Sequence, residues 1–119
     1  MWSKEKIQDW YDDHKWLVGC NYLPSSAINQ LEMFQEDSFD ADTNKREVGW
    51  ARDVGFNSLR IYLHDLLWQD KESFKKRLNE ILSLCSDHNI KPILVLFDDC
   101  HRPFPKLGKQ PLPVRGCLL

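Results

Sequence analysis

Hydrophobic and polar residues alternate along the chain in the manner of an α/β protein. Three short apolar runs predict strands, at residues 16–20, 57–63 and 92–97. In the second run, Leu59, Ile61 and Leu63 alternate with more polar residues. The third run is apolar throughout, which is typical of a parallel strand that is buried on both faces.

Helical spacing and capping residues predict helices over residues 4–14, 40–54 and 70–88. Ser3, Asp40 and Asp70 stand where N-caps belong, and Gly55 stands where a C-cap glycine belongs. In the longest helix we expect an apolar stripe from Phe74 to Cys85. The opposite, polar face is expected to carry Lys75, Lys76, Arg77 and Glu80. Residues 21–39 show no period, so we predict a long loop there.

The order strand, helix, strand, helix, strand predicts right-handed parallel βα units in one α/β domain. The length of 119 residues suits one domain but is well short of the ~250 residues of a complete (β/α)₈ barrel. Four of the six prolines lie between residues 103 and 113, so we expect residues 101–119 to be an irregular, Pro-rich basic tail. Its basic residues are consistent with a solvated tail or with an anion contact.

The net charge of -2 gives no overall field for nucleic acid or anionic membranes, so neither is an expected partner. No secretory signal or membrane span is apparent, which indicates a cytoplasmic protein with free thiols. The scattered glycines form no phosphate-binding loop, so no cofactor is expected. A metal site is not expected either, because the only dense set of ligand types, residues 98–101, is contiguous.

In parallel α/β proteins, ligands bind at the carboxyl ends of the strands. Polar or aromatic residues follow each predicted strand here, which is consistent with a site and also with ordinary loop polarity. They are Asn21 and Tyr22, with Glu32 and Phe34 further along the same loop, then His64 and Asp65 with Trp68 close behind, then Asp98 and Asp99.

Arg60 lies inside a predicted strand, where an unpaired charge would be costly. It either forms a buried ion pair or sits at the floor of a pocket and positions a catalytic carboxylate. His64 shares the same strand face and is either a site residue or a histidine satisfied by the adjacent loop backbone. Asp98 and Asp99 point to opposite faces, so they suit a hydrogen-bonding rim better than a catalytic pair.

Three segments, residues 16–35, 55–68 and 95–100, resemble the first three strands and their loops in cellulase-like glycoside hydrolases of bacteria. Members of that family are often labelled 1,4-β-xylanase. The resemblance implies the first three strands of a (β/α)₈ TIM barrel, a retaining mechanism and a polysaccharide or oligosaccharide substrate. Arg60 matches the second-strand arginine that supports the family's nucleophile.

The resemblance also implies which residues meet the sugar. Those that match positions around the sugar site are Asn21, Tyr22, His64, Asp65, Asp98 and Asp99. Glu32 and Phe34 would wall the site, with Phe34 as an aromatic platform for a sugar ring.

The sequence departs from the family in one respect that affects chemistry. The acid/base glutamate of this clan follows the fourth strand and the nucleophile follows the seventh, so no catalytic residue is expected here. We therefore expect an N-terminal fragment that is inactive alone, from a truncated, frameshifted or split gene. The alternative is a free-standing, non-enzymatic βα binding or interaction module. Either would self-associate through an exposed sheet edge.

Overall fold

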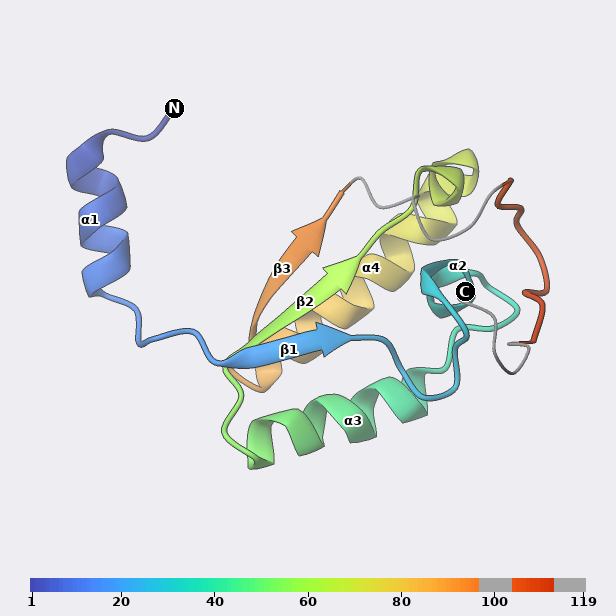
Figure 1. Ribbon diagram of the computed structural model, residues 1–119, viewed down its shortest axis with the longest axis horizontal. Helices are drawn as coiled ribbons and strands as arrows, with labels where there is room; N and C mark the ends of the chain where they lie inside the picture. The colour runs from blue at the N-terminus through green and yellow to red at the C-terminus, as the bar shows by residue number, and fades with distance from the viewer. Residues whose placement is uncertain (97–103, 113–119) are drawn as a thin grey trace.

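The computed structural model describes residues 1–96 and 104–112, which form a small α/β fold (Figure 1). The elements, in chain order, are α1 (Lys4–Asp12), β1 (Gly19–Tyr22), α2 (Gln30–Phe34), α3 (Ala41–Asp53), β2 (Ser58–Tyr62), the 3₁₀ helix η1 (Asp65–Asp70), α4 (Lys71–Asp87) and β3 (Lys91–Val95).

The strands form one parallel sheet in the order β1-β2-β3, which confirms the prediction of parallel βα units. The first strand begins later than predicted, at Gly19. The Asn57 side chain explains this, because it accepts from the Val18 N–H at 2.7 Å and donates to the Trp16 carbonyl at 2.9 Å. Those two contacts tie the preceding apolar residues to a loop instead of a strand.

The predicted N-caps are confirmed. Ser3 accepts from the Lys6 N–H, Asp40 from the Thr43 N–H and Asp70 from the Ser73 N–H. The Thr43 N–H holds the pKa of the Asp40 carboxyl below its ordinary value, because the hydrogen bond favours the charged form. Gly55 has φ of +94°, a conformation that favours glycine, as expected after α3.

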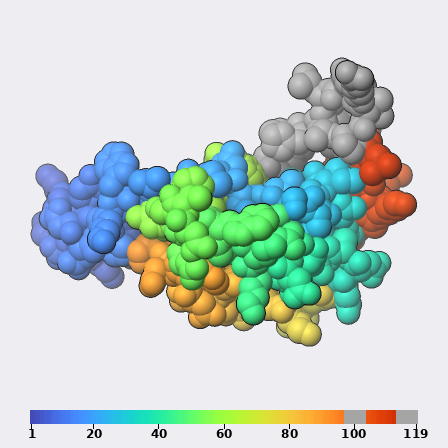
Figure 2. All heavy atoms as spheres, turned by 90° about the horizontal axis from the view of Figure 1, so that it is seen from below, coloured from blue at the N-terminus to red at the C-terminus, as the bar shows by residue number. Residues whose placement is uncertain are grey.

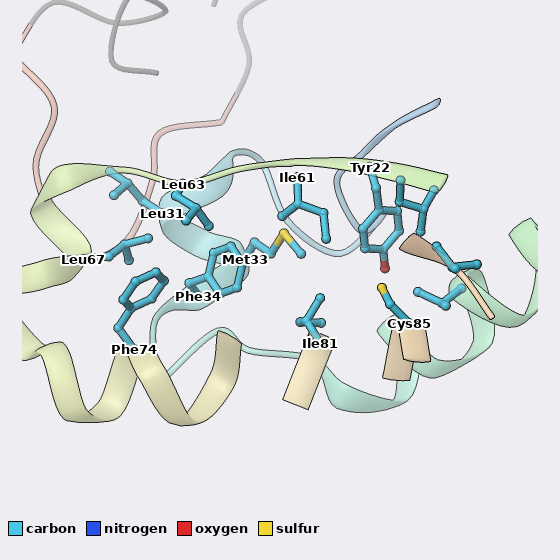
Figure 3. Packing of buried hydrophobic residues seen from close by; sticks show 13 residues of the cluster. Tyr22, Leu31, Met33, Phe34, Ile61, Leu63, Leu67, Phe74, Ile81 and Cys85 are labelled. Carbon is cyan, nitrogen blue, oxygen red and sulfur yellow. The ribbon is translucent and has the colours of Figure 1, made fainter. Parts of the chain in front are cut away.

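The core lies between one face of the sheet and helices α3 and α4 (Figure 3). Leu59 and Ile61 project from β2 toward Val48 of α3 and toward Ile81 and Cys85 of α4, and all five are buried. Alternate residues of a strand point to opposite faces. The alternation in the second apolar run therefore predicts that Leu59 and Ile61 face the core.

The predictions for residues 30–34 and for Arg77 are wrong. Residues 30–34, predicted as loop, form α2, and its Leu31, Met33 and Phe34 are almost completely buried. Arg77 was placed on the exposed face of α4 but is only 9% exposed. Its Nε donates to the Phe34 carbonyl at 2.7 Å, so α2 supplies the partner that makes burial of this guanidinium tolerable.

The strand β3 is not buried on both faces, contrary to expectation. Ile93 is 49% exposed, because the helices cover only one face of the sheet within the described part of the chain. We call the other face the open face. Register and alternation place on it the side chains of Asn21, Arg60, Tyr62, Ile93 and Val95.

Helix α1 extends away from the sheet, at one end of the molecule (Figures 1 and 2). The apolar stripe of Ile7, Trp10 and Tyr11 forms as predicted but is exposed, and α1 contains no buried residue. Among the residues described, no helix is long and apolar enough to cross a membrane.

Candidate functional site

The three strands end side by side at one edge of the sheet, which we call the carboxyl edge (Figure 1). Helix α2 follows β1 at this edge and contacts η1, which follows β2. The segments that follow the first two strands therefore lie side by side.

Arg60 occupies the middle strand of the open face, next to Asn21 of β1 and Ile93 of β3 in the same row. Its side chain is exposed, and its guanidinium carbon lies 4.8 Å from the centre of the Tyr62 ring, one step nearer the carboxyl edge. This geometry is wrong for a buried ion pair. The cation is stacked on an aromatic ring, and its N–H groups have no hydrogen-bond partner within residues 1–96 and 104–112, so they can meet a carboxylate or a hydroxyl.

Asn21 and Tyr22 both match positions around the sugar site in the sequence resemblance, but they point to opposite faces of the sheet. Asn21 is exposed on the open face beside Arg60. Tyr22 is buried on the helix side, where its hydroxyl donates to Asn44 Oδ1 at 2.7 Å. Desolvation raises the pKa of Tyr22 far above its ordinary range, and the Glu47 carboxylate adds to this effect. Tyr22 is therefore a core residue in this structure.

His64 and Asp65 form a polar pair at the end of β2. His64 is 6% exposed, and its Nδ1 lies 2.7 Å from an Asp65 carboxylate oxygen. The Leu66 N–H lies near both groups, 3.2 Å from His64 Nδ1 and 2.8 Å from the same Asp65 oxygen. His64 Nδ1 thus meets the backbone of the adjacent loop, the contact that one of the two interpretations predicts. Asp65 remains the exposed member of the pair.

Glu32 and Phe34 have structural roles in α2. The Glu32 carboxylate accepts a hydrogen bond from the Ile28 N–H at 2.7 Å. The backbone N–H of Glu32 donates to the Asn29 side chain, which caps the helix, at 3.1 Å. Phe34 is 1% exposed and meets Phe74 edge to face, with ring centres 5.4 Å apart. A buried ring presents no face to a sugar, so the assignment of Phe34 as a platform does not fit this structure.

Asp98 and Asp99 lie outside the described residues. Among the described residues, Arg60 and Asn21 lie side by side on the open face, and the exposed Asp65 carboxylate follows β2 beyond the carboxyl edge. These are hydrogen-bonding groups that suit a ligand rich in hydroxyls. No cluster of three or more metal-ligating side chains occurs among residues 1–96 and 104–112.

Sequence reasoning missed a set of amide side chains that joins α2 to residues 104–112. Asn29 donates to Gln110 at 2.9 Å, and Gln35 donates to the Gly108 carbonyl at 3.1 Å. The spacing of Asn29 and Glu32 is close to that of a capping box and could have revealed α2. No local pattern indicates its partner, because the two segments are more than seventy residues apart in sequence.

A shallow hollow of about 240 Å³ lies at the other end of the sheet, between the segment after α1 and the loops before β2 and β3. Its polar Asn57 side chain is already bonded to the backbone of residues 16 and 18. We therefore place the candidate site at the carboxyl edge. Comparisons with models of protein families, with curated proteins and with solved structures found no match.

Proposed function

We propose that this chain forms the first three strands of a (β/α)₈ barrel in a retaining β-glycoside hydrolase of the cellulase-like or xylanase-like kind. It would supply part of the sugar-binding rim together with the positioning arginine, Arg60. The proposal assigns it no catalytic residue, because both catalytic glutamates of that clan belong to later strands. Its ligand is a polysaccharide or an oligosaccharide.

The sheet topology is the observation that carries this proposal. Each strand is the neighbour of the next in sequence, so the chain advances across the sheet in one direction. Right-handed crossovers then place α3 and α4 on the same face, and the opposite face stays open. A doubly wound sheet reverses direction and covers both faces, whereas a barrel advances continuously with its inner face free of helices.

Arg60 supports the same assignment. On a barrel its row on the open face would point inward, and its guanidinium leans toward the carboxyl edge over Tyr62. An inward, cationic side chain near that edge can hold a carboxylate of a later strand in position and lower its pKa, which a nucleophile requires.

A titration with sugars tests the proposal. We would follow backbone amide resonances of the isotope-labelled chain while adding xylohexaose or cellohexaose to millimolar concentrations. We expect shifts at Asn21, Arg60 and Asp65 and none on the outer face of α4. Arg60→Ala should weaken the shifts, whereas Arg52→Ala, an exposed arginine of α3, should not. Sugar-induced shifts confined to other regions, or none, would refute the proposal.

Assays of the chain alone give a second test. Pure protein should not hydrolyse an aryl β-glycoside above a no-enzyme control, because no acid/base and nucleophile pair is assigned to it. Turnover that survives further purification and tracks the protein peak would overturn this assignment.

The alternative is a free-standing βα module that binds a partner or a second copy. The exposed Ile93 and Leu96 at the β3 side of the sheet favour this possibility, because uncovered apolar side chains drive association. Size-exclusion chromatography discriminates between the two. A defined dimer supports the module, and a monomer that shows the sugar shifts supports the barrel fragment.

We also propose a cytoplasmic location. Of the described cysteines, Cys20 and Cys85 are both free, as expected in a reducing compartment.

A further inference from the structure

Residues 104–112, which we call the strap, lie against α2 (Figure 1). Gln35, directly after α2, makes a two-way contact with Gly108 of the strap. Its Nε2 donates to the Gly108 carbonyl at 3.1 Å, and its Oε1 accepts from the Gly108 N–H. The glutamine thus pairs with both backbone groups of one residue, as a neighbouring strand would.

Gln110 provides the second half of this contact. It is 2% exposed, and its Nε2 donates to the carbonyls of Lys106 and Gly108 at 3.0 and 2.7 Å. Its Oε1 accepts from Asn29 Nδ2 at 2.9 Å. The three amides, Asn29, Gln35 and Gln110, therefore fold the strap and fasten it to both ends of α2. We call them the latch.

The strap gains little from burial of apolar side chains. Phe104 is 89% exposed, Leu112 is 75% exposed and Leu107 is 40% exposed. Its attachment to α2 consequently depends on hydrogen bonds, which water can replace when the strap moves away. Segments with few buried apolar contacts open at lower free energy than the core.

The backbone at Phe104 adds a second feature. Its φ is +55°, in the left-handed region that bulky residues rarely adopt. Such a conformation persists only where the surrounding contacts hold it. The strap is thus attached by replaceable hydrogen bonds and contains a residue whose backbone would relax on release.

We propose that the strap is a latched lid that opens as a unit while the sheet, α3 and α4 stay folded. Opening exchanges the bonds of the latch for water and relaxes Phe104, so it uncovers the two ends of α2 at Asn29 and Gln35. This movement does not depend on the proposed function.

Amide hydrogen exchange of the sugar-free chain tests the lid. In the wild type we expect the Gly108 amide to exchange more slowly than an unstructured amide but faster than core amides such as that of Ile81. Gln110→Ala removes the bond to Asn29, so it should speed exchange at Gly108 about tenfold. Exchange at Ile81 should stay unchanged.

Two further variants give opposite or null results. Phe104→Asn should slow exchange at Gly108, because asparagine tolerates φ near +55° better than phenylalanine. Lys109→Ala changes an exposed strap residue and should have no effect.

Gly108 exchange equal to that of the core in the wild type, or a parallel change at Gly108 and Ile81 in Gln110→Ala, would overturn the lid. The same holds for Gly108 exchange at the unstructured rate. No sugar is present, so failure of the sugar titration would leave this result unaffected.

Discussion

Two residues with titratable side chains, Tyr22 and Cys85, share the core beneath β2 (Figure 3). Desolvation raises the pKa of the Cys85 thiol from its ordinary 9.0 to about 11. It also raises the pKa of Tyr22, so both groups are held in their neutral forms. A raised pKa means that the folded state retains protons that the unfolded chain releases at lower pH.

The first prediction follows from this difference between the two states. The Cys85 contribution is fully present below pH 9 and is lost as pH rises through about 11, so the free energy of unfolding should fall across this interval. Urea unfolding at a series of pH values measures the fall. Cys85→Ala should reduce it, whereas Cys20→Ala, at an exposed cysteine, should not. Identical pH profiles for Cys85→Ala and the wild type would contradict the assignment.

At the scale of elements, Arg77 joins two helices that are far apart in sequence. Its Nε donates to the Phe34 carbonyl of α2 at 2.7 Å, and its terminal nitrogen donates to Ser73 one turn earlier in α4. A short helix such as α2 is marginal by itself, so its position depends on contacts of this kind and on its buried apolar side chains.

Arg77→Lys is therefore expected to destabilise the protein although charge is kept. Lysine has no Nε–H in the guanidinium geometry, and a buried Phe34 carbonyl without a partner costs about 1–3 kcal/mol. Urea unfolding should show that loss, and α2 amides should lose protection first. Lys76→Ala, at an exposed position of the same helix, should stay within about 0.5 kcal/mol of the wild type. Equal effects of the two substitutions would refute this role for Arg77.

At the scale of the whole molecule, stability is concentrated in the sheet and in the helices packed on it, and α1 is not part of that unit. Two isoleucines on helices show the contrast. Ile81 of α4 is 1% exposed, whereas Ile7 of α1 is 53% exposed. Both have a helical environment, so their difference isolates the effect of packing.

The matched pair Ile81→Ala and Ile7→Ala tests this division. The first should lower the free energy of unfolding by about 2–5 kcal/mol, because it leaves a cavity in the core. The second should change it by less than about 0.5 kcal/mol. Chemical denaturation of both variants measures the difference. A large effect of Ile7→Ala would show that α1 packs against the rest of the protein in solution.

Local patterns were enough to predict most elements. The side chains of Ser3, Asp40 and Asp70 satisfy backbone N–H groups three residues ahead, so the starts of three helices follow from neighbouring residues alone. Alternation likewise fixed the buried face of β2. The loop prediction for residues 30–34 failed because a helix of five residues is too short to show a period.

The candidate site was predicted less well, because its residues depend on what lies across from them. The sequence identified the polar strand ends, including Asn21 and Asp65, and singled out Arg60 inside the second strand. It could not show that Tyr22 faces Asn44 in the core or that Phe34 is covered by Phe74. Both aromatic residues lie beside polar residues in the sequence. Only their packing in the folded protein distinguishes a core side chain from a sugar platform.

By itself, then, the sequence determined the α/β class, the helix starts and the parallel order of the strands, since capping, alternation and crossover handedness act over short stretches or follow from connectivity. Only the tertiary structure decided the burial of Arg77, the exposure of Ile93 and the fastening of the strap by Gln35 and Gln110. Each of these depends on whether segments that are remote in sequence contact the residue or leave it exposed. The chain's local preferences do not encode such partners.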